Sequence, residues 1–294
     1  MKDLLSERYA ERVPQEEIVG TNGGINYIPH HGVYHPKKPD KLRVVFDCSA
    51  RFKGQCLNQY LLQGPNLTNT LIGVLCRFRH EPVAFMCDIK AMFHQFSVNP
   101  EHRDFLRFLW WENGDLQSDP VEYRMRVHLF GATSSPGCAN FGLKQSAIDH
   151  EKEYGSDVGD FIRHNFYVDD GLKSVATEDE AAHLINRSKL LCQRVGLKLH
   201  KFTSNSTKVM GTLPPEEHSK GVKDLNVMYN SSNIERALGV YWCVESDTFQ
   251  FRISLQDKPL TRRGTFPCKL GLRPIRVFSS RCVSRETNTS GDVQ

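Results

Sequence analysis

Two adjacent carboxylates, Asp169 and Asp170, constrain this chain more than any other feature of its sequence. They follow a short apolar and aromatic run, Phe166 to Val168, and Gly171 comes directly after them. Like charges a few ångströms apart repel each other and raise one pKa, so such a pair is costly without a neutralising partner. Side chains alternate along a strand, so a tight turn, which Gly171 permits, is needed to bring both carboxylates to one edge. The pair is therefore either a solvated hairpin turn or a site for hard cations such as Mg²⁺.

The composition is that of a globular protein. The chain has 294 residues, of which 39% are hydrophobic and 24% charged, and its net charge is +4. This length can bury a core in one large domain or two smaller ones. The charge is compatible with a polyanionic partner but lies below the strongly basic level of many nucleic-acid-binding domains. We expect no membrane span, because no apolar run is long enough, and nine scattered cysteines indicate a reduced intracellular compartment.

The N-terminal part holds two features with competing interpretations. Residues 1–30 are polar and weakly patterned, so we expect an exposed lead-in. Three histidines follow, but the flanking Pro and Gly predict a loop without acidic or cysteine ligands, which argues against a metal site: His30, His31 and His35. A strand is predicted over residues 42–47, and its Arg43 is either solvated or a clamp for a triphosphate.

The middle of the chain predicts a buried strand between two helices. Residues 60–80 have helical spacing, and residues 83–89 form a continuous apolar strand that carries Asp88 near its end. Because an unpaired buried charge is costly, Asp88 is a candidate functional residue. Small and hydroxylated residues before Pro136 predict the start of a helix that runs to about Tyr154. Four of its residues lie roughly on one face: Cys138, Phe141, Ala147 and Ile148.

The C-terminal part predicts a second helix and more strands. Thr177 and Glu180 form a capping box for a helix that ends at Gly196. Residues 197–202 alternate like an exposed strand, and residues 236–242 and 248–253 form a predicted hairpin.

This order of elements predicts a split βαβ arrangement, an antiparallel sheet backed by two helices. In that topology the strand that ends near Asp88 lies beside the hairpin with Asp169 and Asp170, which brings three carboxylates to one sheet edge. Three carboxylates around two Mg²⁺ ions suit an in-line phosphoryl transfer.

The motifs at these places resemble those of reverse transcriptases. Residues 167–170 (Tyr-Val-Asp-Asp) match the catalytic signature of that family, and residues 87–93 resemble its first aspartate motif. Three further segments are similar to the template-positioning segment, the lysine-bearing motif and the primer grip: residues 129–136, 196–202 and 238–241. The details are closest to Pao/BEL-type LTR retrotransposons, over residues 27–33, 41–50 and 130–132.

The resemblance implies an α+β, right-hand polymerase with fingers and palm over residues 25–264. The palm, about residues 83–244, would be a split βαβ (ferredoxin-like) antiparallel sheet backed by helices. Residues 1–24 would be a polar lead-in. After Gly264 the family continues into a helical connection segment, whereas this chain does not, so we expect residues 265–294 to be a divergent, disordered tail that follows a frameshift or a mispredicted exon.

The resemblance also implies roles for individual residues, which would act on a dNTP and a primer. Two Mg²⁺ ions, or Mn²⁺ as an alternative, would be bound by Asp88, Asp169, Asp170 and the Ile89 carbonyl. Arg43 would hold the incoming triphosphate, and Phe93 would exclude a ribose 2′-hydroxyl. Lys201, or Lys198, is a candidate general acid for the pyrophosphate. The primer end would be gripped by Leu238, Gly239 and Val240. Retroviral enzymes usually carry Gln where Phe130 stands, so the contact of that Gln does not transfer.

The implied function is RNA-directed DNA polymerase activity on an RNA or DNA template, in cytoplasmic virus-like particles. Other segments of a polyprotein, namely a peptidase, a ribonuclease H and an integrase, would be its partners. The first alternative is a catalytically inactive, truncated remnant that only binds nucleic acid. An RNA-dependent RNA polymerase is disfavoured by Phe93 and by Tyr167. An aspartic peptidase is disfavoured because residues 169–171 are Asp-Asp-Gly rather than Asp-Ser/Thr-Gly.

Overall fold

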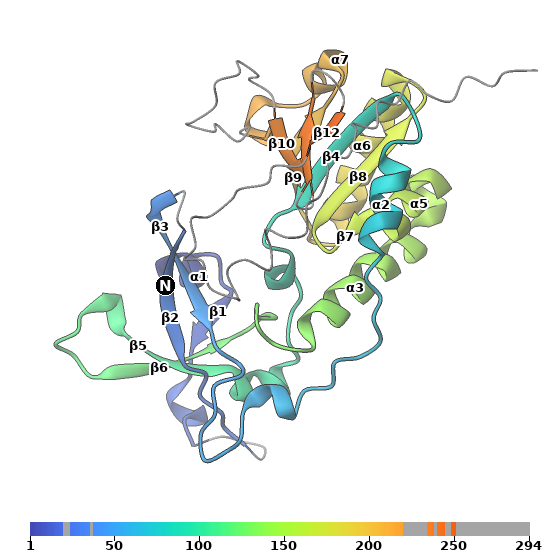
Figure 1. Ribbon diagram of the computed structural model, residues 1–294. Coiled ribbons are helices and arrows are strands. Elements are labelled where there is room, and N and C mark those ends of the chain that lie inside the picture. Colours follow the sequence, from blue (N-terminus) through green and yellow to red (C-terminus); the bar gives the residue numbers. More distant parts are fainter. Residues whose placement is uncertain (20–23, 36–37, 220–233, 238–239, 245–247, 251–294) are drawn as a thin grey trace, which may run out of the picture. The chain divides into compact units, whose positions relative to one another are not determined.

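The computed structural model describes residues 1–19, 24–35, 38–219, 234–237, 240–244 and 248–250 (Figure 1). The chain forms two compact units. Unit 1 comprises Met1–Asn69, Ile89–Asp169 and Arg187–Leu199, and unit 2 comprises Thr70–Asp88, Asp170–Asn186 and His200–Gln294. Both units combine helices with antiparallel strand pairs, so the fold is α+β, as predicted.

The elements of unit 1 are mostly short. Its helices are α1 (Lys2–Ser6), α3 (Ser135–Asp149), α4 (Glu151–Tyr154) and α5 (Ser156–His164), with 3₁₀ turns η1 (Gln15–Glu17), η2 (Leu57–Gln59), η3 (Met92–Gln95), η4 (Pro100–Leu106) and η5 (Glu112–Gly114). Its strands are β1 (Ala10–Arg12), β2 (His30–His35), β3 (Lys38–Phe46), β5 (Arg107–Trp111), β6 (Pro120–Met125) and β7 (Phe166–Tyr167).

Unit 2 contains the strand with Asp88. Its elements are α2 (Leu71–Phe78), α7 (Thr207–Gly211), η6 (Pro215–Glu217), β8 (Asp170–Val175), β10 (Ile234–Ala237), β11 (Val240–Cys243) and β12 (Thr248–Gln250). Three elements extend across a unit boundary: β4 (Val83–Ile89), α6 (Glu178–Arg194) and β9 (Leu199–Ser204).

The N-terminal segment is part of the unit 1 fold. Strands β1, β6 and β5 form an antiparallel sheet in that order, in which Ala10 pairs with Met125. Ala10 and Val13 are buried. The prediction of an exposed lead-in is therefore wrong here, because a three-residue strand is too short to show a hydrophobic period in the sequence.

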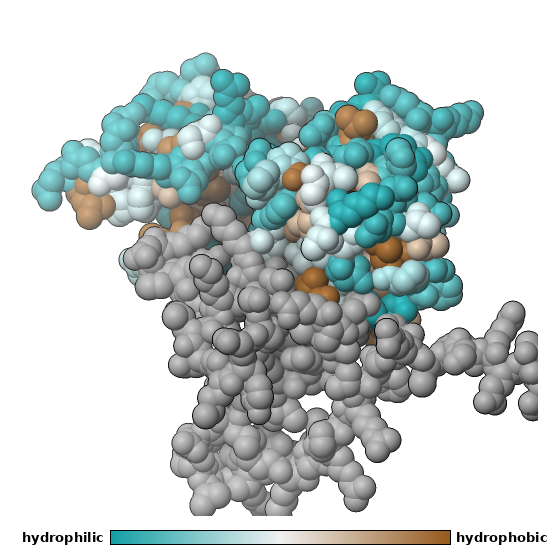
Figure 2. Space-filling model, turned by 90° about the horizontal axis from the view of Figure 1, so that it is seen from above, coloured by the Kyte–Doolittle hydropathy of each residue, from teal (hydrophilic) through white to brown (hydrophobic). Residues whose placement is uncertain are grey.

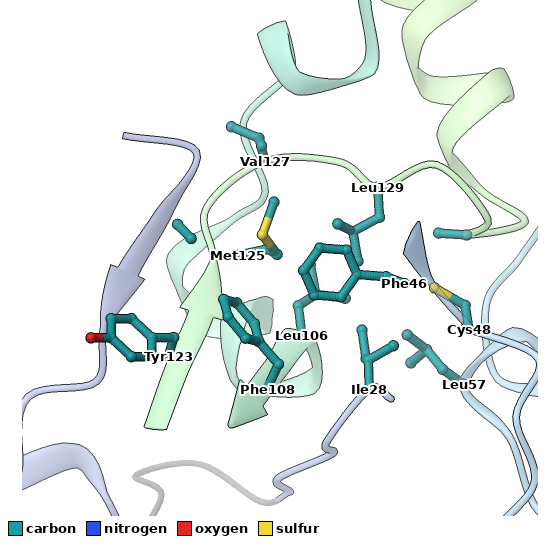
Figure 3. Close-up of a cluster of buried hydrophobic side chains, with 12 residues drawn as sticks. Ile28, Phe46, Cys48, Leu57, Leu106, Phe108, Tyr123, Met125, Val127 and Leu129 are labelled. Carbon is teal, nitrogen blue, oxygen red and sulfur yellow. The ribbon is translucent and has the colours of Figure 1, made fainter. Parts of the chain in front are cut away.

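The core of unit 1 lies beside this sheet and is rich in aromatic rings (Figure 3). Phe46 contacts Phe108 edge to face at 5.1 Å between ring centroids, and Phe108 stacks on Tyr123 at 5.8 Å. Burying one such side chain contributes about 1.5–3 kcal/mol to the free energy of unfolding. The cluster thus joins β3, β5 and β6 although these strands belong to two separate sheets.

Two arginines in the sheet formed by β1, β6 and β5 form a network of ion pairs. Arg107 and Arg124 lie directly opposite each other on β5 and β6, which would be repulsive alone. The fully buried Arg107 donates to Asp104 at 3.0 Å and to Glu122 at 2.9 Å. Arg124 donates to Glu11 at 2.8 Å. The carboxylates therefore neutralise both charges, tie η4 to the sheet and add a side-chain link between β1 and β6.

Strands β8, β4 and β9 lie side by side in that order in the sheet that holds Asp88 (Figure 1). Strands β4 and β8 are antiparallel, and their register runs from Val83 opposite Val175 to Asp88 opposite Asp170. The strand with Asp88 lies beside the hairpin strand, as predicted, and its other neighbour is the closing strand β9. Asn205, after β9, holds the start of β4 by accepting from Ala84 N at 2.9 Å and donating to Pro82 O at 2.8 Å.

The predicted helix α6 begins and ends as its sequence indicates. Thr177 Oγ1 accepts from Glu180 N at 3.2 Å, and Glu180 Oε2 accepts from Thr177 N at 3.3 Å, which is the predicted capping box. Gly196 follows the helix with φ +79°. Of the five apolar residues that the sequence predicts to face inward, Val195 is half-buried and the other four are buried: Leu184, Ile185, Leu191 and Cys192.

Three local predictions are wrong. The helix predicted over residues 60–80 is only α2, because Gly64 adopts φ +73° and the N-cap is Thr70. In α3, Ala147 is buried while Cys138, Phe141 and Ile148 are exposed, so the four residues share no face. The strand predicted over residues 236–242 is two antiparallel strands, β10 and β11.

Hydrophilic and hydrophobic residues are unevenly distributed on the one face that Figure 2 shows. On the face seen in Figure 2, hydrophilic residues dominate the coloured surface and hydrophobic residues occur in small separate patches. None of the helices in the described ranges is long and apolar enough to cross a membrane. The predicted tail, residues 265–294, lies outside the described residues, and the predicted domain boundaries stay predictions.

Candidate active site

Asp88 and Asp170 face each other across two paired strands. They are direct partners in the register of β4 and β8. Directly opposite residues of an antiparallel pair project to the same side of the sheet, and like charges there are destabilising. The tertiary structure thus opposes two of the three carboxylates that we predicted at one sheet edge, and these two are 82 positions apart in the sequence. The juxtaposition of Asp169 with them stays a prediction.

Two basic side chains of β9 hold the Asp88 carboxylate. His200 Nε2 lies 2.5 Å from Asp88 Oδ1, and Lys201 Nζ donates to Oδ2 at 2.9 Å. Burial raises the pKa of the Asp88 carboxyl, but the hydrogen bonds with His200 and Lys201 lower it more, so its net pKa lies below its ordinary value. The carboxylate is therefore held ionised, with one partner on each oxygen.

A backbone irregularity allows two consecutive residues to reach one carboxylate. Lys201 adopts φ +54° within β9, a left-handed conformation that is unusual for a residue other than glycine. This breaks the alternation that would send His200 and Lys201 to opposite faces. Sequence reasoning identified Lys201 but missed His200. One feature of the sequence pointed to His200: it is a polar residue directly before Lys201, in a strand whose apolar and polar residues otherwise alternate.

The turn before Asp170 is also left-handed, but not at the predicted residue. Val168 adopts φ +56°, whereas Gly171 lies in β8 opposite Cys87. A β-branched residue in this conformation is an outlier, and such strain concentrates at functional sites. Within unit 1, Ile89 N donates to Asp169 O at 2.8 Å, which fixes the backbone of both residues.

The fold of this chain is similar to that of a known structure. A structure of the foamy viral protease–reverse transcriptase in complex with double-stranded DNA matches 84% of this chain with a TM-score of 0.53 and 13% sequence identity. The chain has a reverse-transcriptase fold. It covers 33% of the length of that neighbour.

Two structures of the prototype foamy virus protease–reverse transcriptase match 67% of this chain at 18% identity, with TM-scores of 0.48 and 0.47. This chain covers 22% of their length. No protein-family description matches the sequence, and no curated protein sequence matches it.

The oxygen donors suit a hard divalent cation such as Mg²⁺. Asp88 and Asp170 offer carboxylate oxygens on one side of the sheet, and an ion between them would remove their repulsion. Within the described residues, no three His, Cys, Asp or Glu side chains are grouped closely enough to hold a metal ion. Carboxylate oxygens are thus the ligand type that Mg²⁺ prefers, but no third ligand is grouped with them in the described ranges, and binding at Asp88 would have to replace its contacts with His200 and Lys201.

The predicted nucleotide-binding residues lie in unit 1. Arg43 is exposed on β3. Phe93 lies in η3, where Ala91 with φ +49° turns the chain out of β4. Its ring packs on Phe130 at 4.5 Å between centroids and is 8% exposed. Lys198, the alternative general acid, is exposed, and its carbonyl accepts from Lys90 N.

The remaining predicted residues lie partly outside the described ranges. Leu238 and Gly239 of the predicted primer grip lie outside the described residues, and Val240 is the first residue of β11. His30 packs against the rings of Phe46, Phe108 and Trp110 at 5.5–5.6 Å. This histidine is part of an aromatic cluster, and His30, His31 and His35 lie in strand β2, so the prediction of a loop at these histidines is wrong.

Proposed function

We propose that this chain is the fingers and palm of an RNA-directed DNA polymerase from a Pao/BEL-type LTR retrotransposon, and that it adds dNTPs to a primer 3′-hydroxyl. The observation that carries the proposal is the opposition of Asp88 and Asp170 at a sheet edge, with Asp169 next to Asp170 in the sequence. The reverse-transcriptase fold supports it independently.

In the proposed site, Asp88, Asp169, Asp170 and the Ile89 carbonyl hold two Mg²⁺ ions, or Mn²⁺. When bound, these ions supply activation of the attacking hydroxyl and neutralisation of charge on the phosphorus. Arg43 binds the triphosphate of the incoming dNTP, and Phe93 lies against its sugar. Leu238, Gly239 and Val240 hold the primer end.

Lys201 is the better supported of the two candidate general acids. Its ammonium reaches the Asp88 carboxylate, whereas the placement of Lys198 shows only a backbone contact in the described structure. In the proposed reaction, release of Lys201 from Asp88 leaves its proton available to the departing pyrophosphate oxygen. The contact of His200 with the other carboxylate oxygen is likewise replaced when Asp88 binds the metal.

The test is Mg²⁺-dependent extension of a DNA primer on an RNA template. We expect the wild-type chain to extend the primer with dNTPs, and Asp169→Asn and Asp88→Asn to lose at least about a hundredfold in rate. Asp179→Asn is the matched control, because this exposed carboxylate of α6 pairs with Lys208. No extension by the wild-type chain, or equal extension by Asp169→Asn, would refute the polymerase proposal.

The second candidate is a remnant that binds nucleic acid without catalysis. One observation favours it: His200 and Lys201 occupy both Asp88 oxygens, which would otherwise be open to a metal ion. Binding of primer–template without extension, at any Mg²⁺ or Mn²⁺ concentration, would support this alternative.

A further inference from the structure

Phe130 packs against two consecutive residues of η3. Its ring lies 4.5 Å from the Phe93 ring at an interplanar angle of 50°, and 5.8 Å from the His94 ring at 87°. Phe93 is 8% exposed and Phe130 is 54% exposed. Phe130 therefore covers Phe93 while much of its own surface remains open.

The loop that carries Phe130 is fixed on both sides of the ring. Leu129, the preceding residue, is buried in the unit 1 core (Figure 3). Gly131, the following residue, adopts φ +98°, and a Cβ there would lie 3.0 Å from the Phe46 carbonyl oxygen. The chain thus points Leu129 inward and leaves Phe130 outside, and any side chain at position 131 would be strained by the positive φ and would crowd the Phe46 carbonyl.

Asn58 clamps this loop with one side chain. Its Nδ2 donates to Gly131 O at 2.9 Å, and its Oδ1 accepts from Thr133 N at 2.9 Å. Asn58 itself is anchored, because its backbone N donates to Cys48 O at 3.1 Å, next to the core. A single amide therefore satisfies two backbone groups and sets where the Phe130 ring stands.

We propose that Phe130 and Asn58 are positioning residues for sugar selection, in which Phe130 braces the Phe93 ring and Asn58 holds Phe130. This inference rests on the proposed function, in which Phe93 excludes a ribose 2′-hydroxyl. Rejecting one hydroxyl requires a ring that does not yield, and side chains are held in place by packing against fixed neighbours. Without Phe130, the Phe93 ring gains space to rotate away from the added oxygen.

The test measures kcat/KM for single additions of a dNTP and of the matching NTP. We expect Phe130→Ala to lower the preference for the dNTP at least about tenfold, mainly through faster NTP addition. Phe130→Leu keeps an apolar contact with Phe93 and is the variant to use if Phe130→Ala does not fold. It should lower the preference for the dNTP less than Phe130→Ala does. Asn58→Ala should also lower the preference for the dNTP, because the Asn58 amide holds the backbone of the loop that carries Phe130.

Two exposed residues of unit 1 are matched controls. Phe141→Ala removes a ring that is 58% exposed on α3, and Asn66→Ala removes a loop amide that accepts from Thr68 N. Both should leave selectivity unchanged. In the double variant Phe93→Val with Phe130→Ala, selectivity should equal that of Phe93→Val alone, because a brace acts only through the ring that it holds. Independent, multiplicative losses would overturn the bracing role and indicate direct contact of Phe130 with the nucleotide.

A measurement without catalysis separates this inference from the proposed function. If the wild-type chain extends no primer, the polymerase proposal fails, but the ¹⁹F resonance of 4-fluorophenylalanine at position 93 still reports ring motion. We expect a narrower line in Phe130→Ala and an intermediate line in Asn58→Ala. A line width unchanged by Phe130→Ala would overturn the brace.

Discussion

At the scale of single residues, Asp88 is the clearest case of an environment that sets a charge. Its carboxylate contacts His200 and Lys201 although burial alone favours the neutral form. Its pKa in the folded chain therefore lies below that in the unfolded chain, which is about 3.9. The resulting stabilisation is present above about pH 4 and is lost as the pH falls through the lowered pKa.

This sign gives a prediction for stability against pH. When the pH is lowered from about 5 to about 2, the free energy of unfolding should fall further in the wild-type chain than in Lys201→Met. The variant lacks the ammonium group, so folding depresses the pKa of Asp88 less and less stabilisation is lost on protonation. Urea denaturation at each pH measures it. In the Asp88→Asn background, Lys201→Met should leave the pH dependence unchanged; the same change with and without Asp88 would contradict the assignment.

At the scale of elements, buried arginine pairs connect β1, β5 and η4. Arg107 is fully buried, whereas Arg12 on β1 is exposed although it also pairs with a glutamate at 3.1 Å. Removing one partner of a buried pair leaves an uncompensated charge, and an exposed pair contributes little. The same type of interaction should therefore differ strongly in effect between these two positions.

The prediction compares two alanine variants. Arg107→Ala should lower the free energy of unfolding by about 3–5 kcal/mol. Arg12→Ala should lower it by less than about 1 kcal/mol. Chemical denaturation monitored by tryptophan fluorescence measures both, since Trp110 and Trp111 lie on β5. Similar losses in the two variants would contradict the structural role of the buried network.

Prediction from sequence succeeded where local rules decide an element. The capping box is predictable because its two residues, Thr177 and Glu180, are three positions apart. Strand β4 is predictable because its apolar residues form one continuous run. Prediction failed for β1, which is too short for a period, and for residues 60–70, where Gly64 and the cap at Thr70 interrupt helical spacing.

At the scale of the whole molecule, the proposed function requires a surface for a nucleic-acid duplex. The net charge is only +4, so binding should depend on a limited number of phosphate contacts. We expect the affinity for an RNA–DNA primer–template to fall as salt rises, with a slope of roughly −0.9 in log K against log [salt] for each phosphate contact. Fluorescence anisotropy measures this slope.

Catalysis and binding should separate in the same assay. Asp88→Asn should bind primer–template with the slope of the wild-type chain, because a carboxylate at the sheet edge contributes no cation to phosphate contacts. Binding that is independent of salt would contradict a phosphate-tracking surface. Retention of binding with loss of extension would identify Asp88 as catalytic rather than structural.

The sequence by itself determined the α+β class, the order of strands and helices around Asp88 and Asp170, and the acidic residues at the ends of β4 and β8. These features follow from periodicity, capping and chain order, all of which are local. It also pointed to Asp88 before any partner was known, because an acid in a buried strand is costly.

Only the tertiary structure decided which residues surround that acid and what holds the Phe93 ring. His200 is 112 positions from Asp88, and its contact depends on the left-handed turn at Lys201, which the sequence did not indicate. Likewise, the left-handed residue before Asp170 is Val168 rather than a glycine. Such contacts depend on strand register and on backbone conformations that the surrounding packing imposes against local preference.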